Sequence, residues 1–182
     1  ARIENLVTNG TFSLHGGTWE VDNNVWIVGN DSEVIVIDPA HDADGVVNAV
    51  GGRKVLAILL THGHDDHIRA ARETAEKLGA KLYLNPEDRI LWDAVYDSAP
   101  DAEIADGDVF EVAGIELTAL HTPGHSPGST CFYAPALGAL FTGDTLFQGG
   151  PGATGRSYSD YPTIVKSIRE RLFTIPGETV VH

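Results

Sequence analysis

The chain has 182 residues, 42% hydrophobic and 21% charged, which is typical of one globular domain with a substantial core. Its formal net charge of −14, with no run of Lys or Arg, argues against a nucleic-acid partner, because a polyanion would be repelled. No stretch approaches about eighteen consecutive apolar residues, so we expect no transmembrane segment and no membrane partner.

The single cysteine, Cys131, excludes an internal disulfide framework and is compatible with a reducing compartment. It lies in a β-like run, where a packed core thiol is favoured over a nucleophile. Residues 1–5 lack the apolar core of a secretory signal. We therefore expect a cytoplasmic location.

Two strands are predicted near the start of the chain, at 25–28 and 34–37, around a turn at 29–32. Asp38-Pro39 ends the second strand, since proline cannot join a central ladder. The Asp38 carboxylate either orients a histidine of the motif described below or simply ends the strand. The sequence leaves both interpretations open.

Helices and strands are then expected to alternate. A helix at 44–50 is stopped by Gly51-Gly52, and the buried strand 55–60 follows. Apolar residues at helical spacing predict a helix over 68–78. After a strand at 81–84, Asn85-Pro86 is typical of a helix start, and this helix should run to about Val95.

The second half of the chain is predicted to be rich in strands. A loop at 96–108 precedes a hairpin of 109–112 with 115–120, and strands follow at 130–133 and 139–141. The glycine-rich segment 147–160 should be a site loop, and a helix at 162–172 and a strand at 179–181 come last. No linker or repeat is found, so we predict a single mixed α and β domain over residues 1–182.

The segment Thr61–His67 contains three of the chain's eight histidines, directly after a buried strand. Residues two apart in an extended chain point the same way, so His62 and His64 can converge on one point. Asp66 and His67 lie at the turn into the helix and can serve a second point nearby. Imidazole and carboxylate ligands suit zinc, iron and manganese. A two-metal centre is therefore favoured over a polar loop with clustered histidines.

Two further segments have the same character, His121–Gly128 and Phe141–Thr145. In each, an apolar strand gives way to a turn of small residues that carries a potential ligand, and glycine permits the close backbone approach that a metal cluster needs. Each segment alone is weak evidence, since an aspartate at the end of a strand is usually a turn residue. Together with Thr61–His67 they strongly indicate a metal site.

With these three segments the chain resembles the metallo-β-lactamase superfamily. The matching motifs are Thr-His-x-His-x-Asp-His at 61–67, His-Thr-Pro-Gly-His at 121–125 and Thr-Gly-Asp-Thr at 142–145. Within the superfamily the chain looks most like the compact members of the glyoxalase II (hydroxyacylglutathione hydrolase) group. The resemblance implies an α/β (α+β) fold: a four-layer αβ/βα sandwich of two mixed sheets flanked by helices, with the metals at the sheet edges.

The resemblance also implies a set of ligands for two divalent metal ions, zinc first, with iron or manganese as alternatives. One metal would be held by His62, His64 and His125, and the other by Asp66 and His67, with Asp144 bridging both.

The family adds one more histidine to the second metal, in a Gly-His-Gly turn after the last strand. The sequence ends at His182, which by register precedes that turn. We therefore expect the domain to be truncated at its C-terminal end, with His182 beside the missing ligand rather than replacing it. His15 and His41 match nothing in the family and are expected to be surface or loop residues. His121 is expected to support its turn rather than bind metal.

The reaction that the resemblance implies is hydrolysis of a small-molecule hydroxyacyl thioester by a hydroxide that bridges the two metals. The leaving thiol has a pKa near ~8.5, so the thiolate departs without a strong general acid. Asp66 is the predicted catalytic residue that orients the hydroxide. Arg156 and Tyr158 are the candidate substrate contacts in the glycine-rich loop, and the identity of the thiol stays open.

Other functions remain open at this stage. A persulfide dioxygenase would hold one iron through His62, His125 and Asp144, and a lactonase or β-lactamase-type hydrolase would use the whole centre. A metal-binding protein without catalytic activity is the alternative outside the enzymes. A flavodiiron-type oxidoreductase is disfavoured, because His64 stands where that group has a glutamate.

Overall fold

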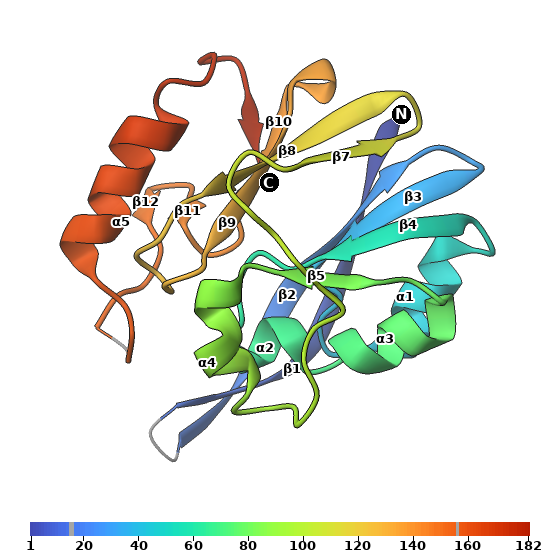
Figure 1. Cartoon of the computed structure of the whole chain (residues 1–182), viewed down its shortest axis with the longest axis horizontal. Coiled ribbons are helices and arrows are strands. Elements are labelled where there is room, and N and C mark those ends of the chain that lie inside the picture. Colours follow the sequence, from blue (N-terminus) through green and yellow to red (C-terminus); the bar gives the residue numbers. More distant parts are fainter. Residues whose placement is uncertain (15–16, 156) are drawn as a thin grey trace.

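The computed structural model of the chain describes residues 1–14, 17–155 and 157–182, which form four layers (Figure 1). Two β-sheets pack face to face, and helices cover the outer face of each sheet. This is the α/β sandwich that the resemblance to the metallo-β-lactamase superfamily implies. The expectation for His15 lies outside the described residues.

The first sheet has the strand order β1-β2-β3-β4-β5-β6. Its strands are β1 (Arg2–Leu14), β2 (Gly17–Gly29), β3 (Glu33–Ile37), β4 (Lys54–Leu59), β5 (Leu82–Leu84) and β6 (Ala102–Glu103). Pairing is antiparallel from β1 to β3 and parallel from β3 to β6. The four strands predicted in this half of the chain are all present.

The long hairpin of β1 and β2 was not predicted from the sequence. Its two strands pair from Arg2 with Gly29 to Leu14 with Gly17. Much of it is exposed to solvent, including Trp19 at 53%. An exposed strand needs no regular alternation of apolar residues, so this hairpin lacks the pattern by which a half-buried strand is recognised. The predicted loop at 96–108 likewise contains the short strand β6.

Helices α1 (Ala43–Val50) and α3 (Ala71–Leu78) pack on the outer face of the first sheet. The Asp42 side chain accepts a hydrogen bond from the Gly45 N–H and caps α1 at its start. Gly51, with φ of 64°, ends α1 as predicted.

The prediction of one helix over 68–78 is wrong, because a break separates α2 (Asp65–Ile68) from α3. The Tyr96 hydroxyl lies 2.6 Å from the carbonyl oxygen of Ile68 and 2.7 Å from that of Arg69. In a continuous helix these carbonyls would accept from backbone N–H groups. Tyr96 comes from a distant segment, so the local periodicity could not reveal the break.

The helix expected to reach Val95 is also shorter. It consists of the 3-10 turn η1 (Pro86–Asp88) and α4 (Arg89–Trp92). Asn85 caps it as predicted, with its side chain accepting from a backbone N–H of the first turn. The Trp92 indole donates to a carbonyl of the following loop at 2.6 Å, which holds the chain as it turns back.

The second sheet has the order β13-β10-β9-β8-β7. Its strands are β7 (Val109–Val112), β8 (Ile115–His121), β9 (Thr130–Ala134), β10 (Ala139–Phe141) and β13 (Val180–Val181), and the 3-10 turn η2 (Pro135–Leu137) joins β9 to β10. The predicted hairpin of β7 and β8 is confirmed. Its turn residues Ala113 and Gly114 both have positive φ, as a tight hairpin turn requires.

Helix α5 (Tyr161–Ser167) covers the outer face of the second sheet and continues as the π-helical turn η3 (Ile168–Leu172), as predicted for 162–172. The glycine-rich segment contains a small hairpin, β11 (Leu146–Phe147) with β12 (Gly150–Pro151). Among the described residues no helix is long and apolar enough to cross a membrane.

The space between the two sheets is filled by buried apolar side chains, among them Ile35, Leu59, Phe132 and Phe141. Burying each of these contributes roughly 1.5–3 kcal/mol. The packed interior holds the ends of β4, β8 and β10 in fixed relation, and the segments that follow these strands carry the predicted ligands.

Candidate metal centre

The segments after β4, β8 and β10 meet at one edge of the sandwich, together with α2. They bring together all six predicted ligands: His62, His64, Asp66, His67, His125 and Asp144. Three sets of potential ligand atoms each lie within 4.8 Å of one another: two are formed by these six residues, and the third combines Asp38 with His62 and His67. We call His62, His64 and His125 the three-histidine group, and Asp66, His67 and Asp144 the mixed group.

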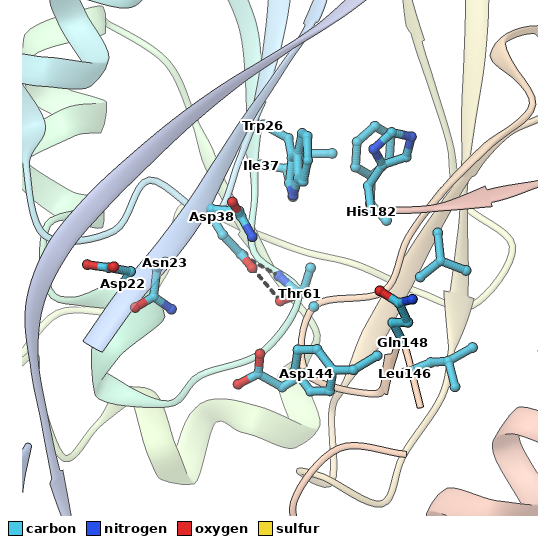
Figure 2. Close-up of a pocket in the computed structure, with 15 residues that line it drawn as sticks. Asp22, Asn23, Trp26, Ile37, Asp38, Thr61, Asp144, Leu146, Gln148 and His182 are labelled. Atoms are coloured by element: carbon cyan, nitrogen blue, oxygen red, sulfur yellow. Dashed lines mark hydrogen bonds between the residues drawn. The ribbon is translucent and has the colours of Figure 1, made fainter. Parts of the chain in front are cut away.

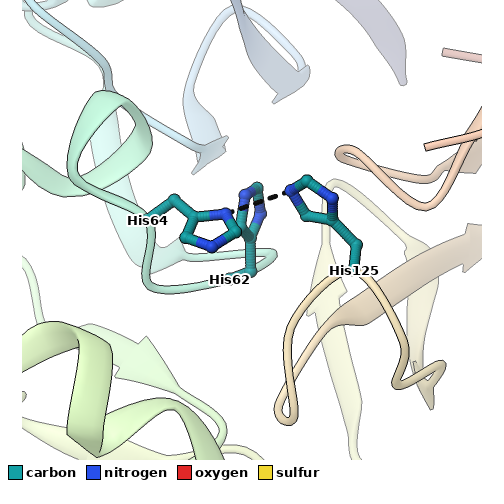
Figure 3. Close-up of side chains that lie close together, drawn as sticks. All are labelled: His62, His64 and His125. Atoms are coloured by element: carbon teal, nitrogen blue, oxygen red, sulfur yellow. Dashed lines mark hydrogen bonds between the residues drawn. The ribbon is translucent and has the colours of Figure 1, made fainter. Parts of the chain in front are cut away.

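The three-histidine group is buried, with its residues 1%, 8% and 1% exposed in chain order. The imidazole rings of His62 and His64 are 4.9 Å apart at their centres, and those of His64 and His125 are 4.7 Å apart. Figure 3 shows the three rings converging, with His64 Nδ1 and His125 Nε2 only 3.0 Å apart. The predicted convergence of His62 and His64 is therefore present, and His125 joins them from the second sheet.

One carboxylate oxygen connects the two groups. Asp144 Oδ2 lies 3.2 Å from His67 Nε2, 3.5 Å from His62 Nε2 and 3.4 Å from His125 Nε2. The same oxygen thus faces both groups at once. This is the placement that a bridging ligand requires.

Two atoms of these groups are buried without a hydrogen-bond partner, His62 Nε2 and Asp66 Oδ1. Buried polar atoms are nearly always paired, and leaving one unpaired costs about 1–3 kcal/mol. Unpaired atoms gathered among imidazoles and carboxylates fit a site built for a metal ion. This donor set suits divalent zinc, iron and manganese alike.

In the mixed group, the aspartates favour the charged form of His67, and His67 favours the charged form of Asp144. Burial lowers the pKa of His67, but the Asp144, Asp66 and Asp38 carboxylates outweigh it and raise that pKa well above 6.5. Burial raises the pKa of Asp144, yet the charge of His67 and the neighbouring imidazoles hold it well below 3.8. For His125, burial dominates and lowers the pKa. Without metal, the mixed group is therefore an ion pair of His67 with Asp144.

Asp38 holds His67 from behind. Its carboxylate accepts from the Thr61 backbone N–H at 2.7 Å and from the Thr61 hydroxyl at 2.6 Å (Figure 2). Its Oδ2 also lies 2.9 Å from His67 Nδ1. Asp38 adopts a φ of 52°, which is uncommon for a residue other than glycine. Of the two interpretations left open by the sequence, the contacts support the orienting role.

Asn23 also contacts the centre and His41 contacts Asn23, and the sequence analysis missed both contacts. The Asn23 amide nitrogen lies 3.2 Å from Asp66 Oδ2 and 3.1 Å from His67 Nε2, and its oxygen lies 2.7 Å from His41 Nε2. His41 is a partly exposed loop residue between β3 and α1, as expected, but its contact with Asn23 was not foreseen. Asn23 lies in a strand without any motif that would mark it as a site residue. His41 adopts a φ of 63°, which turns the chain after Pro39 and could not be inferred from the sequence.

A cavity opens beside the mixed group, between residues 22–26 of β2 and residues 181–182 (Figure 2). Trp26, Leu146 and Phe147 form part of its apolar lining. His182 also lines it, with its ring packed on Trp26 and Phe141 at centre distances of 4.9 and 5.2 Å. Among the described residues, His182 belongs to neither ligand group.

The predicted substrate contacts have different outcomes. Arg156 lies outside the described residues. Tyr158 is 55% exposed and is not part of the cavity lining, so its contact with substrate stays a prediction. The predicted role of His121 agrees with its contacts: His121 Nε2 lies 2.9 Å from the Pro127 carbonyl oxygen and so supports the turn.

Comparison with known proteins identifies the family. The model of the metallo-β-lactamase superfamily matches residues 18–182, and the chain belongs to this superfamily. Hydroxyacylglutathione hydrolase GloC of Haemophilus influenzae is 30% identical over 168 residues, 84% of this chain and 79% of GloC. A Bacillus subtilis protein named "Probable metallo-hydrolase YqgX" is 32% identical over 176 residues, 88% of this chain and 83% of that protein.

Solved structures agree with the fold. The TTHA1623 protein, crystallised in a di-iron-bound form, superposes with a TM-score of 0.77 at 31% identity, covering 87% of this chain and 85% of that one. The chain is therefore a hydrolase of the metallo-β-lactamase superfamily, with a cluster of histidines and aspartates suited to divalent metals.

Proposed function

We propose that the protein hydrolyses a hydroxyacyl thioester to a hydroxy acid and a free thiol, using two divalent metal ions, zinc first among the candidates. The observation that carries the proposal is Asp144 Oδ2, which faces nitrogens of both ligand groups within 3.2–3.5 Å. The three-histidine group would hold one ion and Asp66 and His67 the other, with Asp144 between them.

Metal ions bound there would lower the pKa of a water molecule and polarise the substrate carbonyl. The two oxygens of the Asp66 carboxylate have different surroundings. Its Oδ2 is within reach of the Asn23 amide at 3.2 Å, while its Oδ1 is buried without a partner. Asp66 can therefore bind metal through one oxygen and accept a hydrogen bond from the attacking water, which orients the water toward the carbonyl.

The leaving group explains why a thioester suits this site. A thiolate whose conjugate acid has a pKa near ~8.5 departs without a strong general acid. No side chain is needed to protonate it, and the Asp144 carboxylate, whose pKa is held well below 3.8, has no proton to give. The relationship to a hydroxyacylglutathione hydrolase supports the same substrate class.

We also propose that Tyr158 and Arg156 contact the thiol portion of the substrate, and that the partners are small molecules rather than nucleic acid. The net charge of −14 supports the latter. The free, buried thiol of Cys131 is compatible with a reducing compartment and hence with the cytoplasmic location we infer.

The test is turnover by metal-free protein reloaded separately with zinc, iron or manganese. Substrates would be S-lactoyl thioesters of several small thiols, a lactone, a β-lactam, and a persulfide with oxygen uptake recorded. We expect the thioesters to be hydrolysed fastest, by protein containing two metal ions. Faster turnover of the lactone or the β-lactam, or oxygen uptake with the persulfide, would overturn the proposal in favour of that chemistry.

The substrate contacts have their own test. Tyr158→Phe should raise KM for the best thioester with little change in kcat, while Tyr161→Phe, an exposed tyrosine on α5, serves as the matched control. Equal kinetics for both variants would remove Tyr158 from the site.

A further inference from the structure

Asp88 is a fully buried carboxylate outside the ligand groups. It ends the 3-10 turn η1 and has no exposed surface. Three groups donate hydrogen bonds to its side chain: the Gly63 N–H to Oδ2 at 2.8 Å, the Ser126 hydroxyl to Oδ2 at 2.7 Å, and the Gly128 N–H to Oδ1 at 2.6 Å.

These donors lie next to metal-ligand candidates in the chain. Gly63 stands between His62 and His64, and Ser126 directly follows His125. One carboxylate therefore joins the loop after β4, in the first sheet, to the loop before β9, in the second. It does so across sequence separations of 25 and 38 residues.

The packing around Asp88 leaves no room for adjustment. A Cβ atom added at Gly128 would lie 2.7 Å from the Asp88 backbone nitrogen, and one at Gly63 would lie 3.0 Å from the Asp88 carbonyl oxygen. Both loops thus approach the Asp88 backbone closely because they have glycine at these positions. The backbone bond from the Thr130 N–H to the Thr61 carbonyl, at 2.7 Å, is a second link between the same loops.

A buried carboxylate is costly unless hydrogen bonds compensate the loss of water. The donors here are two backbone N–H groups and one hydroxyl, and hydrogen bonds to a charged group are the stronger kind, about 1.5–3 kcal/mol each. A carboxylate accepts all three, whereas an amide would turn its NH2 group toward a donor. The side chain at this position must therefore accept hydrogen bonds through both of its terminal atoms, as a carboxylate does.

We propose that Asp88 is a positioning residue for the three-histidine group: by joining the two loops it sets the separation of His64 and His125. The proposal rests on the ligand assignment and not on the substrate. It predicts that loss of the carboxylate weakens metal binding at the three-histidine group while leaving the mixed group unchanged.

The experiment is competitive titration of the metal-free full chain with Zn²⁺ against a chelating dye, with visible absorption of the Co²⁺-loaded protein as a second readout. His64→Ala and His67→Ala assign each binding step and each Co²⁺ band to one of the two groups. We expect Asp88→Asn to weaken binding at the three-histidine group about 10- to 100-fold, the usual effect of losing a residue behind the ligands. The Co²⁺ band assigned by His64→Ala should change with it.

Asp101→Asn is the matched control. Asp101 also accepts from a backbone N–H, that of Leu82 at 2.8 Å, and from Arg72 at 3.0 Å, but it touches neither ligand loop. The proposal is overturned if Asp88→Asn weakens both groups equally, weakens neither, or acts no more strongly than Asp101→Asn.

A milder variant covers the case in which Asp88→Asn does not fold. Ser126→Ala removes one of the three donors and should give a smaller loss of metal affinity at the three-histidine group. Without a selective loss at that group the proposal fails.

If His64→Ala leaves metal binding intact, the ligand assignment fails, and the proposal about Asp88 fails with it. Absence of thioesterase activity would count against the proposed function and leave the Asp88 result standing.

Discussion

The carboxylates that support the three-histidine group and the mixed group make different kinds of contact. Around the three-histidine group, Asp88 binds backbone N–H groups and a serine hydroxyl beside the ligands. Around the mixed group, Asp38 and Asn23 reach the ligand side chains themselves, within 2.9–3.2 Å of His67 and Asp66.

The difference has a physical consequence. The contacts of Asp88 to the backbone set how far apart the two loops lie, but they do not touch the imidazoles. The protons of that group depend on other contacts, such as the Ala153 carbonyl oxygen, 2.7 Å from His125 Nδ1, and the Thr61 hydroxyl, 3.0 Å from His62 Nδ1. Contacts to ligand side chains set ring orientation and charge, because an acceptor at His67 Nδ1 keeps a proton there and turns Nε2 toward the metal side. The two groups should therefore respond differently to mutation and to pH.

The largest effect should come from Asp144, whose Oδ2 faces both groups. Asp144→Ala removes the link and should strip metal from both, lowering kcat about 10³-fold or more, equivalent to about 4 kcal/mol. Metal analysis and steady-state kinetics test this. Near-normal metal content would mean that Asp144 is only a turn residue and that the groups are independent.

Metal binding should depend on pH through the mixed group. Because the carboxylates overcome burial and raise the pKa of His67 well above 6.5, the metal-free protein carries a proton there at neutral pH. A metal needs the neutral ring, so binding releases this proton and affinity should rise about tenfold per pH unit below that pKa. In the metal-free chain the same proton stabilises the fold fully below pH 6.5, and the stabilisation is lost as pH rises through the folded value.

Calorimetric titration in two buffers of different ionisation enthalpy counts the released protons. His125, whose pKa burial lowers, should release none at neutral pH. Asp38→Asn removes one of the charges that hold the proton on His67 and should reduce the count. Binding without proton release in the unmodified protein would contradict the charge assignment of the mixed group.

A smaller effect is expected from His41, which acts on the mixed group only through Asn23. His41→Ala frees the Asn23 amide to rotate and should weaken metal binding at the mixed group about tenfold. Gly10→Ala should do the same, because a Cβ at Gly10 would overlap the His41 ring. Zn²⁺ titration measures both variants. A loss at the three-histidine group instead would break the distinction between the two groups.

The smallest effect on the centre should come from Cys131, a core residue. Burial raises the pKa of its thiol to about 12, so the folded protein should not react with thiol reagents and should react once unfolded. Cys131→Ala should cost about 1–2 kcal/mol of stability and leave metal content unchanged. Fluorescent labelling and thermal unfolding measure these outcomes, and rapid labelling of folded protein would show that the thiol is accessible.

The sequence by itself determined which segments carry ligands and what fold surrounds them. Apolar runs and turn residues predicted the buried strands of both sheets, because burial imposes a local pattern on each, but they missed the exposed β1–β2 hairpin and the short β6. The histidines and aspartates after three of those strands identified a metal centre, since the type and spacing of the donor residues can be read directly from the sequence. Thr61–His67 needed no tertiary information to be recognised as part of it.

Only the tertiary structure decided what holds these ligands. The sequence shows Asp88 as a first-turn acid, Asn23 as a strand residue and His41 as a loop residue. In the structure Asn23 contacts the centre, His41 contacts Asn23, and Asp88 contacts the loops that form the centre. The break between α2 and α3 depends in the same way on Tyr96 from a distant loop. These contacts join residues far apart in the chain, and packing of two sheets, rather than any local pattern, brings them together.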